Sequence, residues 1–172
     1  FKQKTAYEIL TCDWSSDVCS SDLADHLKLI EEQRREKHWT GAIVTNPNCS
    51  TIVLAMALAP LRVFNIRTVI VSTMQAISGA GYPGVPSLDI LGNVVPFIGG
   101  EEPKMEMETL KILGGDGGRA AYPAVVSAHT NRVPVIDGHT MTVSVAFEHK
   151  PTIEQVAEAM RSFAGQIGRA HV

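Results

Sequence analysis

The 172-residue sequence is poor in several features that mark whole classes of protein. Aromatic residues make up only 6% of it, and 15 basic residues nearly balance 18 acidic ones, for a net charge of −3. This balance argues against binding nucleic acid by neutralising its phosphates. The longest apolar run, residues 52–59, is far shorter than the roughly 20 residues of a membrane span. With 14 Gly and nine Pro the chain is not of low complexity. We therefore expect a soluble globular protein with no nucleic-acid or membrane partner.

Cysteine is scarce as well, being present only at Cys12, Cys19 and Cys49. An odd number in a short chain does not suggest a disulfide framework, and no apolar segment typical of a secretory signal is found near residue 1. We expect a reducing, cytoplasmic setting. No Cys or His spacing typical of a metal site occurs, and no GxxxxGK[ST] phosphate loop is present, so no metal is expected.

The two ends differ from the middle of the chain. Residues 1–23 have no sustained helical or strand period. Both this segment and residues 166–172 resemble translated sequencing-adapter read-through. We expect them to be non-native, with the first segment disordered, and exclude both from the fold prediction. Cys49 is the one cysteine left between them.

The middle predicts helices mixed with strands. Expected helices and turns are a solvated helix at 25–37, a turn of capping residues at 46–51, an apolar helix at 52–61, a short helix capped by Ser87 and ending at Leu91, a helix at 101–113, and a helix from the capping-box pair Thr152 and Gln155 to about Ala164. Expected strands are 41–45, 67–77, 124–136 and 139–147, the last alternating as in a sheet with one buried face. This order predicts α/β structure at the start and α+β afterwards.

Cys49 is the residue whose position suggests chemistry. It lies at a predicted helix start, behind Pro47 and a capping Asn48. The partial positive charge and free N–H groups of a helix N-terminus favour a thiolate and can hold an oxyanion. The alternative interpretation, a small buried hydrophobic residue, fits most free cysteines.

A nucleophilic cysteine needs a base, and His139 is a candidate because it follows a glycine between two predicted strands. The alternative is an ordinary turn histidine. Arg132 lies on an otherwise apolar strand, where its guanidinium needs an anionic partner such as a carboxylate or phosphate. Gln75 ends a strand before the glycine loop 78–81, where its amide could orient a substrate; the alternative is an edge-strand polar residue.

Four segments together resemble aspartate-semialdehyde dehydrogenase, especially its archaeal and fungal branch. They are TNPNCST at 45–51, MQAISGAGYPG at 74–84, GGEEPK at 99–104 and NRVPVIDGHT at 131–140. The resemblance covers residues 24–165.

The resemblance implies a fold in two parts. Residues 24–48 would be the end of a Rossmann-type dinucleotide domain. Residues 49–165 would form an incomplete catalytic and dimerisation domain like that of glyceraldehyde-3-phosphate dehydrogenase, with a mixed or antiparallel sheet and helices on one face. The glycine-rich first βα turn of such a dinucleotide domain is absent. We therefore expect the 172-residue chain to lack NADP-dependent activity.

The resemblance also implies roles for the residues that carry chemistry. Cys49 resembles the nucleophile that forms a thiohemiacetal and then a thioester. His139 resembles the acid/base that takes the thiol proton and serves the oxyanion, with Asn48 as helix cap beside it. Gln75 resembles the amide that orients the substrate, and Arg132 the clamp on its carboxylate.

Other residues match the family less directly. Glu101 and Lys104 resemble the Glu-x-x-Lys pair near the substrate amino and phosphate groups, and Glu102 competes for the first role. The alternative for all three is a solvated helix start. Ser78 and Gly79 would lie near the nicotinamide.

The family reaction is the NADP-dependent reductive dephosphorylation of aspartyl phosphate, a small-molecule substrate, in lysine, methionine and threonine biosynthesis. The family forms homodimers or homotetramers. Three alternatives remain open: a malonyl-CoA reductase on the same scaffold, a cofactor-free cysteine hydrolase, and a non-enzymatic dimerisation module.

Overall fold

The computed structural model describes residues 28–41, 46–115 and 120–163. Its helices are α2 (Lys28–Lys37), α3 (Cys49–Leu58), α4 (Ser87–Ile90), α5 (Glu101–Leu113) and α6 (Ile153–Ser162), with 3-10 turns η3 (Ala59–Phe64) and η4 (Ile77–Ala80). Its strands are β1 (Ile66–Gln75), β2 (Val125–Arg132) and β3 (His139–Phe147). The adapter-like ends and all but the first residue of the predicted strand 41–45 lie outside the described residues.

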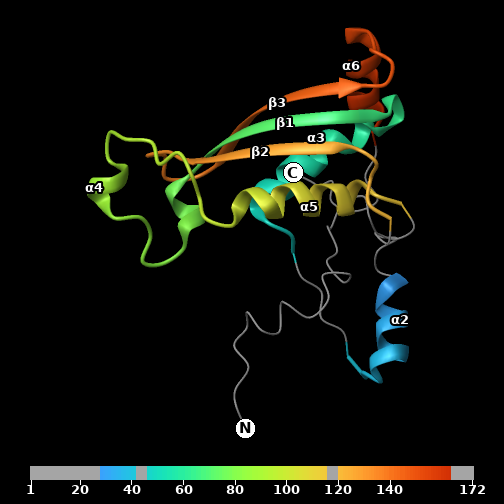
Figure 1. Ribbon diagram of the computed structural model, residues 1–172, viewed down its shortest axis with the longest axis horizontal. Helices are drawn as coiled ribbons and strands as arrows, with labels where there is room; N and C mark the ends of the chain where they lie inside the picture. The colour runs from blue at the N-terminus through green and yellow to red at the C-terminus, as the bar shows by residue number, and fades with distance from the viewer. Residues whose placement is uncertain (1–27, 42–45, 116–119, 164–172) are drawn as a thin grey trace.

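The strands form one mixed sheet with β1 in the centre (Figure 1). β1 runs parallel to β2 and antiparallel to β3. A parallel pair requires a long crossover, and here the chain between β1 and β2 contains η4, α4 and α5. The mixed sheet expected from the sequence is confirmed.

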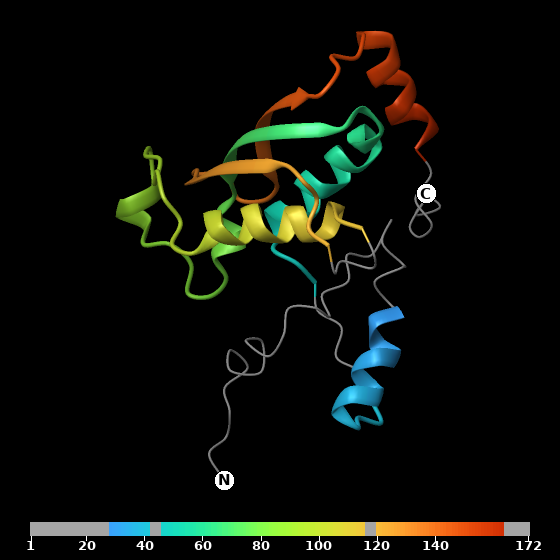
Figure 2. The same ribbon diagram turned by 45° about the vertical axis from the view of Figure 1, so that its right-hand side comes forward.

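Helices α3 and α5 cover one face of this sheet (Figures 1 and 2). The core between them is apolar, and its most deeply buried side chains, each at most 2% exposed, are Leu54, Leu58, Ile66, Val69, Val71, Met105 and Leu113. No helix of the described residues lies along the centre of the opposite face, where Ile70 and Val125 are 52% and 65% exposed. Helices on one face were expected, and the structure confirms them.

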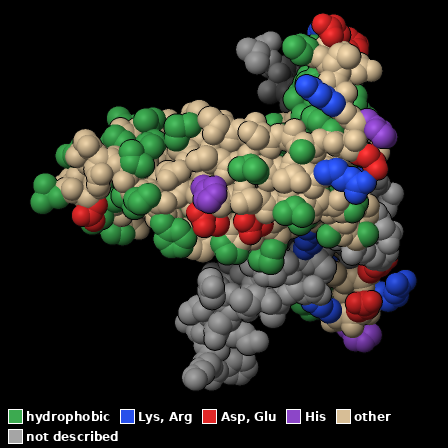
Figure 3. All heavy atoms as spheres, turned by 45° about the horizontal axis from the view of Figure 1, so that its top comes forward, with side chains coloured by type: hydrophobic (Ala, Val, Ile, Leu, Met, Phe, Trp, Pro, Cys, Tyr) green, Lys and Arg blue, Asp and Glu red, His purple; other side chains and the backbone are tan. Residues whose placement is uncertain are grey.

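Helix α2 lies apart from the sheet and the helices that cover it (Figure 2). An arm of residues 81–98, which contains α4, extends past the end of the sheet that lies away from α6 (Figure 1). The surface of this arm is rich in hydrophobic side chains (Figure 3). In this arm Tyr82, Leu88 and Phe97 are 100%, 93% and 58% exposed. No helix among the described residues has the length and apolar character needed to cross a membrane.

Of the helix caps predicted at Thr152 and Ser87, the structure confirms the first and contradicts the second. The capping box of α6 forms as predicted: the Thr152 hydroxyl accepts from the Gln155 N–H at 3.2 Å, and the Gln155 side chain accepts from the Thr152 N–H at 2.8 Å. The predicted cap at Ser87 is wrong, because Ser87 is the first helical residue and Pro86 occupies the N-cap without a side-chain bond.

Strand β2 is also shorter than the predicted 124–136, since it ends at Arg132. Pro134 has no N–H to donate to a ladder, and the carbonyls of Val135 and Ile136 instead accept hydrogen bonds from η4. These two hydrogen bonds hold η4 next to the end of the sheet.

Candidate active site

The N-terminus of α3 presents Cys49 to solvent. The Asn48 side chain accepts hydrogen bonds from the N–H groups of Ser50 at 3.0 Å and Thr51 at 3.2 Å, so the predicted cap is confirmed. Cys49 is the first residue of the helix, where backbone N–H groups lack intrahelical partners and the helix dipole is positive. Its side chain is exposed. The alternative of a buried hydrophobic cysteine is therefore wrong.

Two carboxylates of α5 hold the turn that precedes Cys49. The Asn48 side-chain amide donates to Glu101 at 2.6 Å, and the Asn48 backbone N–H donates to Glu108 at 2.9 Å. Glu108 is only 8% exposed, and no sequence motif marks it as a site residue. The available signal was its spacing of two helical turns from Glu101, which places both on one face of α5.

Three predicted site residues form a row across one end of the sheet. Gln75 on β1 pairs in register with Arg132 on β2 and with His139 on β3. Directly opposed residues of neighbouring strands point to the same face, which here is the face that α3 and α5 cover. Gln75 and Arg132 are 1% and 6% exposed. The sheet register thus brings together residues that lie far apart in the sequence.

The row meets Cys49 through His139. His139 Nε2 lies 3.2 Å from Cys49 Sγ, and His139 Nδ1 lies 3.3 Å from the Ala76 backbone nitrogen. Arg132 Nη1 donates to the Ala76 carbonyl at 2.8 Å. One peptide segment at Ala76 therefore holds both the histidine and the arginine, although its sequence gave no signal for this role.

The glycine loop lies directly against this pair. A Cβ at Gly79 would come within 2.8 Å of His139 Cε1 and 2.9 Å of Arg132 Nη1. Only glycine fits here without displacing one of these side chains. Its neighbour Ser78 is exposed, and the Ser78 N–H donates to Ile136 at 3.1 Å.

The acidic residues at the start of α5 face two ways. Glu101 lies beside Asn48, whereas Glu102 accepts from the Thr130 N–H on the outer edge of β2 at 3.0 Å. Of these two residues, Glu101 is the one bonded to Asn48, which directly precedes Cys49.

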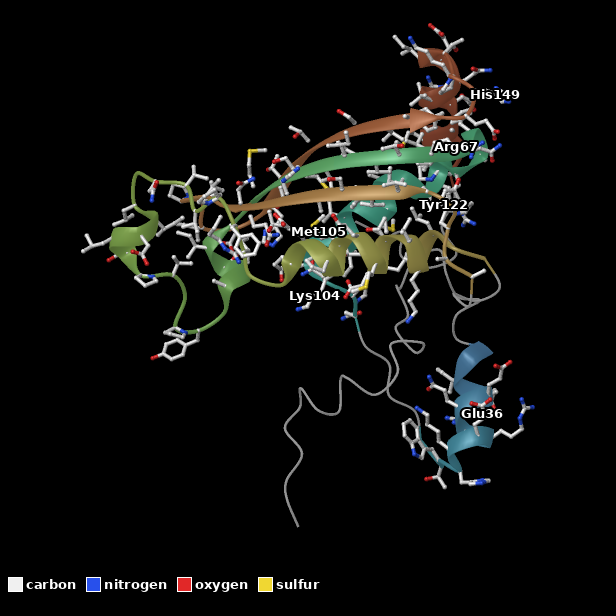
Figure 4. The ribbon with its side chains drawn as sticks, in the orientation of Figure 1. Glu36, Arg67, Lys104, Met105, Tyr122 and His149 are labelled. Carbon is white, nitrogen blue, oxygen red and sulfur yellow. The ribbon has the colours of Figure 1, made fainter. Side chains whose placement is uncertain are left out.

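Lys104 is exposed, and among the described residues it forms no hydrogen bond or ion pair. Figure 4 shows Lys104 and Met105 leaving α5 on opposite sides, with Met105 toward the sheet. Within the described ranges no three His, Cys, Asp or Glu side chains gather as a metal site requires.

The sequence model of one family, described as "Semialdehyde dehydrogenase, dimerisation domain", matches residues 58–169. The chain belongs to this family. The resemblance proposed from the four motifs is thereby confirmed.

The curated relatives that match this chain are considerably longer than it is. An aspartate-semialdehyde dehydrogenase of Archaeoglobus fulgidus is 55% identical over 140 residues, covering 80% of this chain and 41% of that protein. A malonyl CoA reductase (NADP) of Metallosphaera sedula is 38% identical over 143 residues, covering 80% and 40%. The crystal structure of aspartate semialdehyde dehydrogenase with NADP from Candida albicans matches with a TM-score of 0.69 and 37% identity, covering 86% of this chain and 44% of that one. The chain thus spans about two fifths of the length of the curated relatives it matches.

Proposed function

We propose that the chain is the catalytic part of an NADP-dependent aspartate-semialdehyde dehydrogenase. The observation that carries the proposal is the 3.2 Å approach of His139 Nε2 to the exposed Cys49 sulfur, beside the buried guanidinium of Arg132. The supporting comparison is the identity of 55% with an enzyme of that name.

In the proposed reaction the Cys49 thiolate attacks the acyl carbon of aspartyl phosphate. A carbon–sulfur bond forms, the bond from that carbon to the phosphate oxygen breaks, and phosphate leaves, so the acyl group becomes a thioester. The N-terminus of α3 stabilises the negative charge that develops on the carbonyl oxygen. His139 Nε2 lies 3.2 Å from the sulfur, and we assign to it the proton transfers at the sulfur and at this oxygen.

Substrate binding is assigned to the residues around this pair. Arg132 uses one nitrogen for the Ala76 carbonyl and keeps further N–H donors for a substrate carboxylate. Gln75 lies between Arg132 and His139 and would orient the substrate. Glu101 would face its amino group and Lys104 its phosphate.

Asn48 has a double assignment. It fixes the start of α3, and one hydrogen of its amide is engaged by Glu101. We assign its second hydrogen to the oxyanion that forms when Cys49 attacks the substrate carbonyl.

Ser78 and Gly79 would hold the nicotinamide of NADP. The fit rests on Gly79, whose lack of a side chain lets the turn lie against His139, and on the exposed side chain of Ser78 beside it. NADP, when bound, supplies the hydride that reduces the thioester. The chain's own part is to hold the acyl group on Cys49 and to position it. Residues 24–48 as the end of a dinucleotide domain remain a prediction.

The proposed partner is a second copy of the chain. The family is described as a dimerisation domain, and the uncovered sheet face and the hydrophobic arm 81–98 offer surface for such a contact. A homodimer or homotetramer in the cytoplasm, serving lysine, methionine and threonine biosynthesis, is the setting that we propose.

A chimera tests the assignment directly. The matching 140 residues of the Archaeoglobus fulgidus enzyme are replaced by those of this chain, and phosphate-dependent oxidation of aspartate semialdehyde is measured with NADP. We expect activity that Cys49→Ser abolishes. A folded chimera that does not oxidise this aldehyde would overturn the proposal.

The second candidate, a malonyl-CoA reductase, is favoured by the relative of that name at 38% identity. The same chimera assayed with malonyl-CoA separates the two, since preference for malonyl-CoA over aspartyl phosphate would select it. Ester hydrolysis without NADP would point to the hydrolase alternative. Dimerisation without any Cys49-dependent turnover would point to a non-enzymatic module.

A further inference from the structure

The backbone N–H at the start of α3 is bonded by a different helix. In a capping box, a Glu or Gln at the third helical position reaches back to the N–H of the N-cap residue. The third residue of α3 is Thr51, which is neither. Glu108 of α5 takes that place, because its Oε2 accepts from the Asn48 N–H at 2.9 Å across 60 residues of sequence. The cap of α3 is therefore completed by α5.

The two carboxyl groups that hold Asn48 differ in exposure and in what they bind. Glu101 accepts from the Asn48 side-chain amide at 2.6 Å and is only partly buried. Glu108 is 8% exposed and accepts from the backbone. A buried donor and acceptor that separate leave two polar groups without water to replace the lost bond. The contact of Glu108 is therefore the harder of the two to exchange.

The proposed function gives Glu101 a second partner. There its carboxyl faces the substrate amino group, so an ammonium would share Glu101 with the Asn48 amide or displace it. The bond from the Asn48 N–H to Glu108 involves no group that is assigned to the substrate. It can therefore remain in place while substrate enters and product leaves.

The place of Asn48 decides the place of the nucleophile. Asn48 is covalently joined to Cys49, and its side chain caps the first turn that Cys49 begins. The Cys49 sulfur lies 3.2 Å from His139 Nε2 on β3. Helix α5 packs against both α3 and β2. Through Glu108 it thus fixes the turn of the nucleophile relative to the sheet that carries His139.

We propose that Glu108 is a positioning residue for the nucleophile, acting through the Asn48 N–H to hold Cys49 beside His139. The inference rests on the proposed function for its division of roles, in which Glu108 anchors the turn and Glu101 serves the substrate. The effect of Glu108 on the chemistry is indirect, through Asn48.

The first test is the rate of Cys49 alkylation by iodoacetamide at neutral pH in a Cys12→Ser/Cys19→Ser background. Glu108→Ala removes the acceptor of the turn. We expect it to alkylate about fivefold more slowly, because a sulfur that shifts loses its contact with His139. Glu108→Gln keeps an acceptor oxygen and should stay within about twofold of the parent.

Glu106→Ala is the matched control for removing a carboxyl from α5. Glu106 accepts from the Ala128 N–H on β2 at 3.1 Å, so its loss also leaves a backbone N–H without its acceptor. It does not hold the turn before Cys49, and we expect an alkylation rate within about twofold of the parent. An unchanged rate in Glu108→Ala, or an equal loss in Glu106→Ala, would overturn the positioning role.

The second test uses the unaltered chain, so it does not depend on whether Glu108→Ala folds. Amide hydrogen exchange of Asn48 is compared with that of Thr152, whose N–H donates to Gln155 at 2.8 Å in an exposed cap. After correction for intrinsic rates, we expect Asn48 to exchange at least about tenfold more slowly, because its acceptor is buried. Exchange at Asn48 as fast as at Thr152 would overturn the anchor.

The third test separates the two carboxyls in the active chimera. We expect Glu108→Ala to lower kcat at least about fivefold with KM for aspartate semialdehyde within about twofold, and Glu101→Gln to raise that KM about tenfold. An equal rise of KM in both variants would overturn the division of roles. An inactive parent chimera would overturn the proposed function, whereas alkylation and hydrogen exchange need neither NADP nor turnover and would still decide the role of Glu108.

Discussion

Gly79→Ala is the perturbation whose effect the structure defines most sharply. The added Cβ would lie 2.8 Å from His139 Cε1, 3.0 Å from His139 Nε2 and 2.9 Å from Arg132 Nη1. Heavy atoms at optimal van der Waals separation are about 3.5–4.0 Å apart. One of the two side chains must therefore move.

Either movement breaks a contact that defines the site. Arg132 is held by the Ala76 carbonyl at 2.8 Å, and His139 by the Ala76 N–H and the Cys49 sulfur. Overpacking a tight site costs about 1–3 kcal/mol. A lost hydrogen bond, at about 1 kcal/mol, is part of that cost. We therefore expect Gly79→Ala to destabilise the chain by about 1–3 kcal/mol and to change the alkylation rate of Cys49.

The assays are urea unfolding and Cys49 alkylation at neutral pH, with Gly99→Ala as the matched control. A Cβ at Gly99 meets nothing within 4 Å, and its φ is not in the left-handed region. That substitution should change stability by less than about 1 kcal/mol and leave alkylation unaltered. If Gly79→Ala behaves like Gly99→Ala in both assays, the packing of Gly79 against His139 and Arg132 is refuted.

Three further predictions concern the supports of the fold. Glu108→Ala leaves the Asn48 N–H without its acceptor and should cost about 1–3 kcal/mol in urea unfolding, whereas Glu108→Gln, which keeps an acceptor oxygen, should cost less. Arg67 lies at the same end of the sheet as His149 (Figure 4). Its hydrogen bond to Glu148 and its charge hold the pKa of Glu148 below the ordinary value of about 4.5. Ionised Glu148 favours the folded state, so Glu148→Gln should lower the free energy of unfolding at neutral pH. The difference between the parent and this variant should shrink as the pH falls below about 4.5, and a difference that grows in acid would contradict this. Thr152→Ala should lower stability by about 1 kcal/mol through loss of the α6 cap, with Thr152→Ser nearly neutral, and equal losses in both would refute the capping role.

The sequence predicted the parts of the site that depend on local structure. Asn48 caps α3 through N–H groups two and three residues along the chain, so its role follows from neighbours in the sequence. The exposed first position of Cys49 follows from the same cap. Ser87 shows the limit of such signals, since Pro86 took the N-cap position instead.

The contacts of His139 depend on long-range register and could not be derived from a pattern. The histidine and Cys49 are 90 residues apart in the chain, and their approach depends on the pairing of β3 with β1. The sequence also contained no sign of which backbone group would bind the second ring nitrogen. Resemblance to a family suggested the pair, and the sheet register explains it physically.

The acidic residues at the start of α5 show that adjacent helical positions can bond to different elements. Glu101 and Glu102 carry the same side chain and are the first and second residues of α5. Glu101 meets Asn48, while Glu102 bonds the edge of β2, because adjacent helical positions differ in direction by about 100°. Only the placement of α5 between α3 and β2 separates the two.

The most direct test of the account is acylation of Cys49 by β-aspartyl phosphate in the Cys12→Ser/Cys19→Ser chain, followed by intact-protein mass spectrometry. The thioester half of the reaction needs no NADP, so it isolates the residues placed here at the site. The account predicts an aspartyl adduct that hydroxylamine removes, that Cys49→Ser abolishes and that Arg132→Leu forms more slowly. A folded chain that forms no adduct, or one that forms the same adduct in Cys49→Ser, would contradict it.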